Sequence, residues 1–434
     1  MDLGFETIGN ACLIVHDNGP LLATDPWIKG PAYFGSWVTS HEIPEEQLAN
    51  VKAAEYLWIS HGHPDHLSHE SLQELQGKKI LLADHYGGRI ARDLRADGFD
   101  VTVMTDGEWM QLSERVRVLT MGDIQQDSIL LVDAGGNLLV NSNDAIDLGA
   151  GPIVHDIVGQ FENSFLLCLT GYGDADMINF FDEAGERVPP PALKHEPLLD
   201  GIESHLEQYG IRYYVPFSAQ HHYQRSDSVW ANSCATPLSA YEGEFHSPDH
   251  KMLPPFCKYD LIEGRAEAIS PPARPDIVIP CEEFGDNWSD ELEPADVTKI
   301  EAYFRPITHL QTFLGYINFK VGGRDNRIVV NPEHELGITF ECPRASLMSC
   351  IEWNIFDDLM IGNYVKTTLH GPWKKQGTAA LYPDFIPFVG KYADNGGART
   401  PGELKAYFDT YRQRGFLKVD DPEARAAIDR YLNL

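Results

Sequence analysis

The chain has 434 residues, of which 43% are hydrophobic and 11% aromatic, a composition typical of a globular protein with one large core or two smaller ones. Its formal net charge is −31, from 34 basic and 65 acidic residues, and no stripe of Lys or Arg offsets this excess. Such a chain repels phosphate backbones, so we expect no nucleic-acid partner.

Cysteine usage and hydropathy indicate the compartment. The seven cysteines are scattered and form no C-x-x-C pair, so neither a disulfide framework nor a cysteine-bound metal is expected. The first residues lack the basic and apolar regions of a signal peptide, and no apolar run approaches the roughly 18 residues of a membrane span. We therefore expect a cytoplasmic protein that does not enter a membrane.

Strand-like and helix-like segments alternate through the first half of the chain. Residues 68–75 are typical of a helix, with Ser68 as its N-cap. Short apolar runs predict strands over residues 11–15, 21–24, 56–59, 79–83, 101–104, 116–120, 129–132, 138–141 and 213–217. Repeated strands with helices between them predict an α/β fold in which two sheets are sandwiched by helices.

A Pro-rich, irregular stretch marks a change in the second half. We expect one unit over residues 1–255, an irregular connection over 256–295 and a C-terminal α+β extension over 296–434. In the extension, strands are predicted over 313–320 and 328–331, and helices over 344–353 and within 404–430.

Three histidines and one aspartate fall within six residues, directly after the predicted strand 56–59. His61 and His63 alternate, so both can reach one metal ion, while Asp65 and His66 can turn towards a second. Imidazole and carboxylate groups suit zinc, iron or manganese, and two ions about 3.5–4 Å apart can share a ligand. Surface histidines in a polar loop are the alternative, but four potential ligands at this spacing favour a dinuclear metal site.

Asp144 is a candidate bridging ligand, because it follows the predicted strand 138–141 and a carboxylate there can reach both ions. Capping of a turn or helix is its ordinary alternative. In a hydrolytic reaction, Asp65 or Asp144 would also hold and orient the attacking nucleophile, which makes both candidate catalytic residues.

Each ion needs one further ligand. Asp123 follows the predicted strand 116–120 and is a candidate for the first ion, although Asp127 competes and turn formation is the ordinary role of both. His221 and His222 follow the predicted strand 213–217 and are candidates for the second ion. Because adjacent side chains point in different directions, at most one of these two histidines should bind.

The chain resembles the CMP-N-acetylneuraminic acid hydroxylases and the related lactonases of the metallo-β-lactamase superfamily. The H-x-H-x-D-H pattern of the superfamily matches the loop from His61 to His66. Further matching segments are residues 10–13 (NACL), 25–32 (DPWIKGPA), 58–61 (WISH), 65–68 (DHLS), 127–128 (DS), 141–144 (NSND), 214–217 (YVPF) and 356–363 (FDDLMIGN). The resemblance spans nearly the whole chain and implies an αββα metallo-β-lactamase sandwich.

The resemblance also implies that Asp25 lies near the metals without binding them. The chain departs from those hydroxylases twice. It has no C-x-H…C-x-x-H pair, so we expect no Rieske domain with its 2Fe–2S cluster, and an oxygenase would need an external electron donor. It also has Asp123 where the family motif has a histidine, as in diiron β-hydroxylases of the same superfamily that act in antibiotic biosynthesis. A carboxylate there shifts the preference from zinc towards iron or manganese.

The favoured function is a non-haem diiron oxygenase that oxidises a small polar metabolite with O2 and electrons from a ferredoxin or other donor. The alternative is a metal-dependent hydrolase of the lactonase or phosphodiesterase type, in which a hydroxide shared by two ions attacks the substrate. A scaffold without catalysis is disfavoured by the complete ligand loop. The sequence leaves the oligomeric state and the substrate open.

Overall fold

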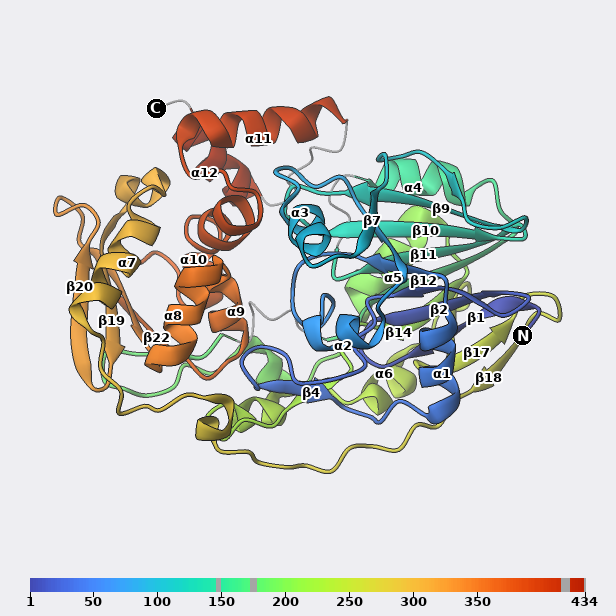
Figure 1. Cartoon of the computed structure of the whole chain (residues 1–434), viewed down its shortest axis with the longest axis horizontal. Coiled ribbons are helices and arrows are strands. Elements are labelled where there is room, and N and C mark those ends of the chain that lie inside the picture. The colour runs from blue at the N-terminus through green and yellow to red at the C-terminus, as the bar shows by residue number, and fades with distance from the viewer. Residues whose placement is uncertain (146–149, 172–177, 415–421, 433–434) are drawn as a thin grey trace.

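The computed structural model describes residues 1–145, 150–171, 178–414 and 422–432. Two large sheets face each other in the half of the molecule that holds the N-terminus (Figure 1). In spatial order, the first sheet contains β18 (Arg265–Ala268), β17 (Cys257–Asp260), β1 (Leu3–Ile8), β2 (Cys12–Asp17), β3 (Pro20–Thr24), β5 (Tyr56–Ile59), β6 (Lys79–Leu82) and β7 (Asp100–Val103). The second contains β16 (Lys251–Met252), β14 (Tyr213–Phe217), β12 (Asn163–Leu169), β11 (Asn137–Asn143), β10 (Ser128–Ala134), β9 (Val116–Gly122) and β8 (Met110–Gln111).

An apolar core fills the space between these sheets. Phe5 and Trp58 of the first sheet pack there with Val132 and Phe165 of the second, and none of the four is exposed. Burying one such large side chain contributes roughly 1.5–3 kcal/mol, so the inner faces of the two sheets hold the layers together.

Helices cover the outer faces of both sheets, as Figure 1 shows. The first sheet is covered by α1 (Glu45–Ala53), α2 (His69–Glu74) and α3 (Arg89–Ala96), and the second by α4 (Gly151–Val158), α5 (Leu199–Tyr209) and α6 (Leu238–Glu244). The backbone N–H of Ser71 donates to Ser68 Oγ over 3.2 Å, which is the predicted N-cap of α2. The predicted αββα sandwich is confirmed.

The strand ends of the two sheets bring the predicted ligands together. β3 and β5 run parallel, as do β11, β12 and β14, and parallel strands end at the same edge of a sheet. Asp25 follows β3, the ligand loop follows β5, and Asp144 follows β11. A two-stranded ribbon of β4 (Trp37–Thr39) and β15 (His221–Tyr223) lies beyond the end of β14.

A third sheet forms the other half of the molecule. Its order is β13 (Phe180–Phe181), β22 (Lys366–His370), β21 (Leu336–Glu341), β19 (Leu314–Val321) and β20 (Arg324–Val329). One face packs in a core with α7 (Pro294–Phe304), α8 (Arg344–Trp353), α9 (Phe356–Ile361), α10 (Thr378–Leu381), the π-helix η6 (Pro387–Asn395), α11 (Pro401–Gln413) and α12 (Pro422–Leu432). Short 3-10 helices are η2 (Pro191–Lys194), η3 (Val229–Cys234), η4 (Cys281–Phe284) and η5 (Thr308–Thr312).

The second half differs from the sequence expectations in three places. The stretch 256–295 begins with β17 and β18, which pair with β1, and is irregular only after them. β20 starts four residues before the predicted strand 328–331, because Gly322 and Gly323 adopt positive φ and turn the chain there. The predicted helix within 404–430 is two helices, each with a proline at its start.

A buried arginine joins the two halves. Arg225 is 0% exposed, and its guanidinium lies 2.7 Å from Asp286 and 3.8 Å from the ring centre of Tyr364. Asp286 in turn accepts a hydrogen bond from the backbone of Ser346 in α8.

Among the described residues, no helix combines the length and the hydropathy that a membrane-spanning segment requires.

Candidate metal centre

The ligand loop follows β5 directly and folds back on itself. The carbonyl of His63 accepts hydrogen bonds from the backbone N–H groups of His66 (3.0 Å) and Leu67 (2.7 Å). The four predicted ligands of the loop are buried, from 0% exposed at His66 to 9% at His63. This burial is not that of a polar surface loop.

His61 and His63 present ring nitrogens to each other. His61 Nε2 lies 2.9 Å from His63 Nδ1. The other ring nitrogen of His61, Nδ1, lies 2.9 Å from Ser60 Oγ, which fixes the direction of the ring. Two imidazole nitrogens that converge in this way can share a proton or bind one cation together.

Asp65, His66 and Asp144 form a second group beside the first. His66 Nε2 lies 3.2 Å from Asp65 Oδ2 and 3.2 Å from Asp144 Oδ2. The ligand atoms of His61, His66 and Asp144 lie within 4.8 Å of one another, so the two groups adjoin. In the described part of the chain, His66 Nε2, Asp144 Oδ1 and His221 Nδ1 are buried without a hydrogen-bond partner, which is rare for polar atoms in protein interiors.

The carboxylates around His66 favour positive charge at this point. Burial alone would lower the pKa of His66, but Asp65, Asp144 and Asp25 together raise it well above its ordinary value. Burial likewise opposes ionisation of Asp65, yet the charge of His66 and the hydroxyl of Tyr33 hold the pKa of Asp65 far below its usual range. The group therefore stabilises a cation, whether a proton or a metal ion.

Asp25 lies behind His66 and organises three segments. It is fully buried, and its oxygens accept from Ser60 N (2.8 Å), Ser60 Oγ (2.8 Å) and Asn143 Nδ2 and lie 3.1 Å from His66 Nδ1. Its φ of 39° lies in the left-handed region, which costs a non-glycine residue free energy and persists only where surrounding contacts enforce it. Asp25 thus fixes the start of the ligand loop, the ring of His66 and the segment before Asp144.

Two polar side chains hold the carboxylate of Asp65. Tyr33 donates its hydroxyl to Asp65 Oδ1 over 2.7 Å, and Asn10 donates its amide to Asp65 Oδ2 over 2.9 Å. Sequence reasoning did not find either role. Asn10 lies in the NACL segment that carried the resemblance, whereas nothing in the sequence distinguishes Tyr33 from other tyrosines.

The structure separates His221 from His222. The pairing of β15 with β4 sends these adjacent side chains to opposite faces. His221 lines the pocket and stacks on Trp37, with ring centres 3.5 Å apart, and burial lowers the pKa of His221 to about 4 despite nearby carboxylates. His222 is not among the lining residues and faces the side of Arg274 and Asp276.

Asp123 and Asp127 are also separated. Asp123 Oδ1 accepts the backbone N–H groups of Gln125 (2.6 Å) and Asp127 (3.1 Å), so Asp123 holds the turn after β9. Burial, followed by the charge of Asp127, raises the pKa of Asp123 well above its usual range. Asp127 lines the pocket instead, with Oδ1 3.7 Å from His61 Nδ1. The carboxylate nearest His61 on this side is therefore Asp127.

The C-terminal part of the chain supplies two residues that were not predicted as site residues, although Asp357 lies in the segment 356–363 that carried part of the resemblance. Asp357 of α9 places Oδ2 3.4 Å from His63 Nε2. Lys391 of η6 places its ammonium group 3.7 Å from Asp127. Burial opposes the charge of Lys391, but Asp127 and Asp357 raise its pKa, so the side chain stays an ammonium ion.

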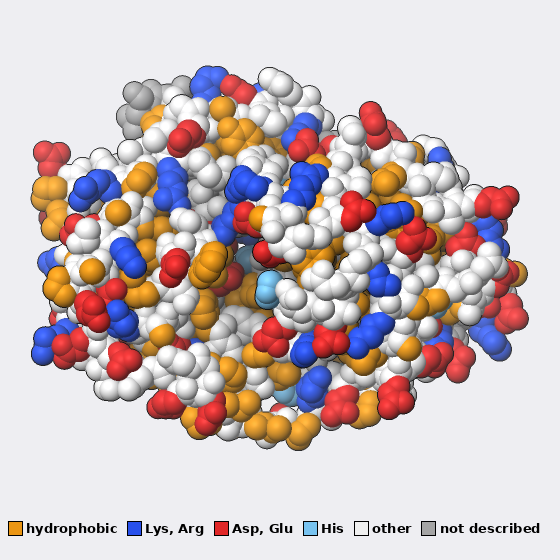
Figure 2. Space-filling view, viewed as in Figure 1, with side chains coloured by type: hydrophobic (Ala, Val, Ile, Leu, Met, Phe, Trp, Pro, Cys, Tyr) orange, Lys and Arg blue, Asp and Glu red, His pale blue; other side chains and the backbone are white. Residues whose placement is uncertain are grey.

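These groups line a cavity of about 330 Å³ between the sandwich and the C-terminal part. Figure 2 shows the hollow between the two halves, with a histidine side chain at its edge. The walls are largely apolar and include Leu169, Ile178, Met360, Ile361 and Ile386. A cavity of this size and lining is suited to a small molecule that carries an apolar part.

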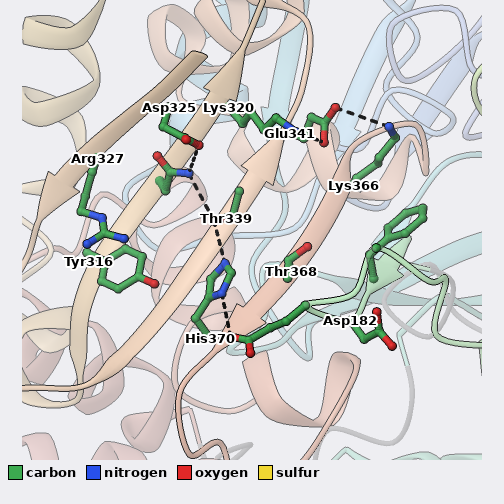
Figure 3. A pocket seen from close by; sticks show the side chains of 14 residues that line it. Asp182, Tyr316, Lys320, Asp325, Arg327, Thr339, Glu341, Lys366, Thr368 and His370 are labelled. Atoms are coloured by element: carbon green, nitrogen blue, oxygen red, sulfur yellow. Dashed lines mark hydrogen bonds and ion pairs between the residues drawn. The ribbon is translucent and has the colours of Figure 1, made fainter. Parts of the chain in front are cut away.

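A second hollow, of about 800 Å³, lies on the uncovered face of the third sheet (Figure 3). Its charges are largely paired with one another: Glu341 accepts from Lys320 (3.2 Å) and Lys366 (3.4 Å), and His370 lies 3.0 Å from Glu183. Among the described residues, both clusters with metal-ligand spacing contribute side chains to the wall of the first cavity and none to this hollow. The first cavity is therefore the candidate active site.

Comparison with known proteins gives partial sequence matches. No protein-family model matches the chain. The cytidine monophosphate-N-acetylneuraminic acid hydroxylase of Danio rerio is 28% identical over 160 residues, which cover 35% of this chain and 27% of the relative. The protein of that name from Gorilla gorilla gorilla is 28% identical over 144 residues, which cover 31% of this chain and 24% of the relative. The match thus covers only about a quarter of these relatives.

Two solved structures are similar in part. CmlA, a diiron β-hydroxylase from Streptomyces venezuelae, is 12% identical with a TM-score of 0.36, and the match covers 60% of this chain and 54% of that one. An isothiocyanate hydrolase from Delia radicum gut bacteria is 16% identical with a TM-score of 0.40, and the match covers 61% of this chain and 99% of that one. The chain thus has the αββα layer order of the metallo-β-lactamase fold, with the ligand loop at the end of β5, and about a third of its length is similar to the hydroxylases.

Proposed function

We propose that the chain is a dinuclear metal-dependent enzyme. His61 Nε2 and His63 Nδ1 would hold the first ion, and Asp65, His66 and His221 the second, with Asp144 between them. The observation that carries this proposal is the convergence of His61, His66 and Asp144, whose ligand atoms lie within 4.8 Å of one another. Among the described residues, His66 Nε2 and Asp144 Oδ1 are also buried without a hydrogen-bond partner. Imidazole and carboxylate donors fit zinc, iron or manganese.

The favoured reaction is oxidation of a small polar metabolite by O2 at two iron ions, with electrons from a ferredoxin or other donor. Asp127 Oδ1 lies 3.7 Å from His61 Nδ1 on the side of β9. Together with Asp65 and Asp144, it makes the site rich in carboxylates, which supports iron or manganese over zinc. The partial match to hydroxylases supports the same choice. When bound, iron supplies the electrons and the coordination site that O2 chemistry requires.

Neighbouring residues would hold the metal ligands in the orientation that the reaction requires. Tyr33 and Asn10 fix Asp65, Asp25 fixes His66, and Trp37 fixes the ring of His221. The apolar wall from the C-terminal part would keep bulk water away from the reacting atoms, which strengthens electrostatic interactions inside the cavity. The cavity volume limits the substrate to a small molecule.

A hydrolase of the lactonase or phosphodiesterase type is the second candidate. Lys391 lines the cavity as a buried ammonium ion, and such a group can stabilise negative charge that develops on a substrate oxygen during hydrolysis. In this reaction Asp65 or Asp144 would orient the attacking water.

Metal analysis of protein purified without O2 tests the proposal. We expect two ions per chain, and the Ala variant of His63 should lose one of them while the Ala variant of His222 keeps both. Fewer than two ions in the unmodified protein would contradict the dinuclear site.

The choice between reactions needs a second measurement. The reduced, iron-loaded protein should consume O2 in a single turnover, whereas the zinc-loaded protein should not. Turnover of a panel of lactones or phosphodiesters without O2 or reductant would overturn the oxygenase and favour the hydrolase.

A further inference from the structure

We infer that Asp357, from the C-terminal part of the chain, is a positioning residue for His63 and sets how tightly the first metal ion is held. The inference rests on the dinuclear site proposed above. It gives the C-terminal part a direct role in metal binding, in addition to forming one wall of the cavity.

The two nitrogens of His63 face different partners. Nδ1 faces His61 Nε2 at 2.9 Å, which is the side on which the two rings would share an ion. Nε2 faces Asp357 Oδ2 at 3.4 Å. If Nδ1 binds the ion, Nε2 carries the proton and donates to Asp357. A carboxylate that accepts from a metal-binding histidine fixes its tautomer and ring orientation and makes the histidine a stronger ligand.

The fold keeps Asp357 in place through a close backbone approach. A Cβ atom at Gly390 would lie 2.7 Å from Asp357 Oδ2, 2.8 Å from its Cγ and 3.0 Å from its Cβ. Real side chains do not pack this closely, so only glycine leaves room for the carboxylate. Gly390 lies in the π-helix η6, an uncommon conformation that occurs often at functional sites.

Asp358 provides the competing interpretation. Ligand atoms of His63, Asp357 and Asp358 lie within 4.8 Å of one another, so these three residues could bind an ion of their own. In that case His63 Nε2 would be a ligand atom and Asp357 would not orient it through a hydrogen bond. Asp358→Asn separates the two interpretations: both Co²⁺ binding steps should be unchanged if Asp357 orients His63, and one step should weaken strongly if Asp358 is itself a ligand.

The test measures Co²⁺ binding by the full-length chain, by competition with a chromophoric chelator and by the visible absorption of bound Co²⁺. We expect Asp357→Ala to weaken one of two binding steps by about 10–100-fold and to leave the other unchanged. Asp357→Asn keeps an acceptor oxygen and should lose less. Gly390→Ala should weaken the same step, because its methyl group displaces the carboxylate.

The double variant Asp357→Ala, Gly390→Ala provides the sharpest check. Asp357→Ala removes the two atoms closest to the new methyl group, Oδ2 and Cγ, and leaves only the Cβ atom at 3.0 Å. The double variant should therefore lose much less Co²⁺ affinity than the sum of the two single losses. Asp384→Ala is the matched control, because Asp384 lies 3.0 Å from a buried histidine, His309, but does not line the cavity. It should leave both binding steps unchanged.

Several results would overturn the inference: wild-type affinity in Asp357→Ala, an equal loss in the Asp384→Ala control, additive losses in the double variant, or an equal loss in Asp358→Asn. If Asp357→Ala does not fold, as judged by near-ultraviolet circular dichroism, Asp357→Asn and Gly390→Ala decide the question. Failure of the dinuclear proposal is distinguishable, because it appears as fewer than two ions in the unmodified protein.

Discussion

The substitution Asp25→Asn should lower the stability of the folded protein even when no metal is bound. The Asp25 carboxylate faces four groups: Ser60 N and Oγ, His66 Nδ1 and Asn143 Nδ2. An amide offers only one oxygen. If the amide oxygen takes the place of Oδ2, it keeps the contacts with Ser60 Oγ, His66 Nδ1 and Asn143 Nδ2. The amide nitrogen then takes the place of Oδ1, where it cannot accept the backbone N–H of Ser60.

The size of the effect follows from these contacts. One buried N–H without an acceptor costs about 1–3 kcal/mol, and three contacts that lose a charged acceptor lose about 1 kcal/mol each. Relief of the burial penalty on the carboxylate offsets part of this, so we expect Asp25→Asn to lower the free energy of unfolding by about 3–5 kcal/mol.

The assay is urea unfolding of the metal-free protein at pH 7, followed by circular dichroism and tryptophan fluorescence. Asp133→Asn is the control, because Asp133 accepts from Arg117 and from the backbone of Gly136 at the surface, where such a change costs less than about 1 kcal/mol. A loss below about 1 kcal/mol in Asp25→Asn would refute the view that Asp25 organises the site.

Three further predictions concern other parts of the molecule. His221→Ala should weaken binding of the second metal ion by about tenfold or more, whereas His222→Ala should not, as equilibrium dialysis can measure. Arg225→Met should lower the free energy of unfolding by about 3–5 kcal/mol, because it leaves the Asp286 carboxylate buried without its ion pair. A decrease below about 1 kcal/mol, the contribution of an exposed ion pair, would contradict this. Burial raises the pKa of Asp394 from 3.8 to about 7, so the folded chain holds this proton more tightly than the unfolded chain and stability falls as pH rises between these values. Asp394→Asn should remove this decrease, on the order of 2–4 kcal/mol, and an unchanged pH profile in urea unfolding would contradict it.

The sequence was sufficient for features that depend on neighbouring residues. His61, His63, Asp65 and His66 follow one strand within six residues, and a loop that short must bring its side chains together. The alternation of strands and helices likewise predicted the αββα sandwich, because each apolar face requires a partner layer.

Tertiary structure decided the contacts that depend on strand pairing and on distant segments. Only the pairing of β15 with β4 turns His221 inward and His222 outward. Only the turn after β9 directs Oδ1 of Asp123 to backbone N–H groups while Asp127 lines the cavity. Asp357 meets His63 across 294 residues of sequence, through an approach that only Gly390 permits. The physical reason is that a ligand loop is specified by local spacing, whereas the groups that orient it are specified by how the rest of the chain packs against it.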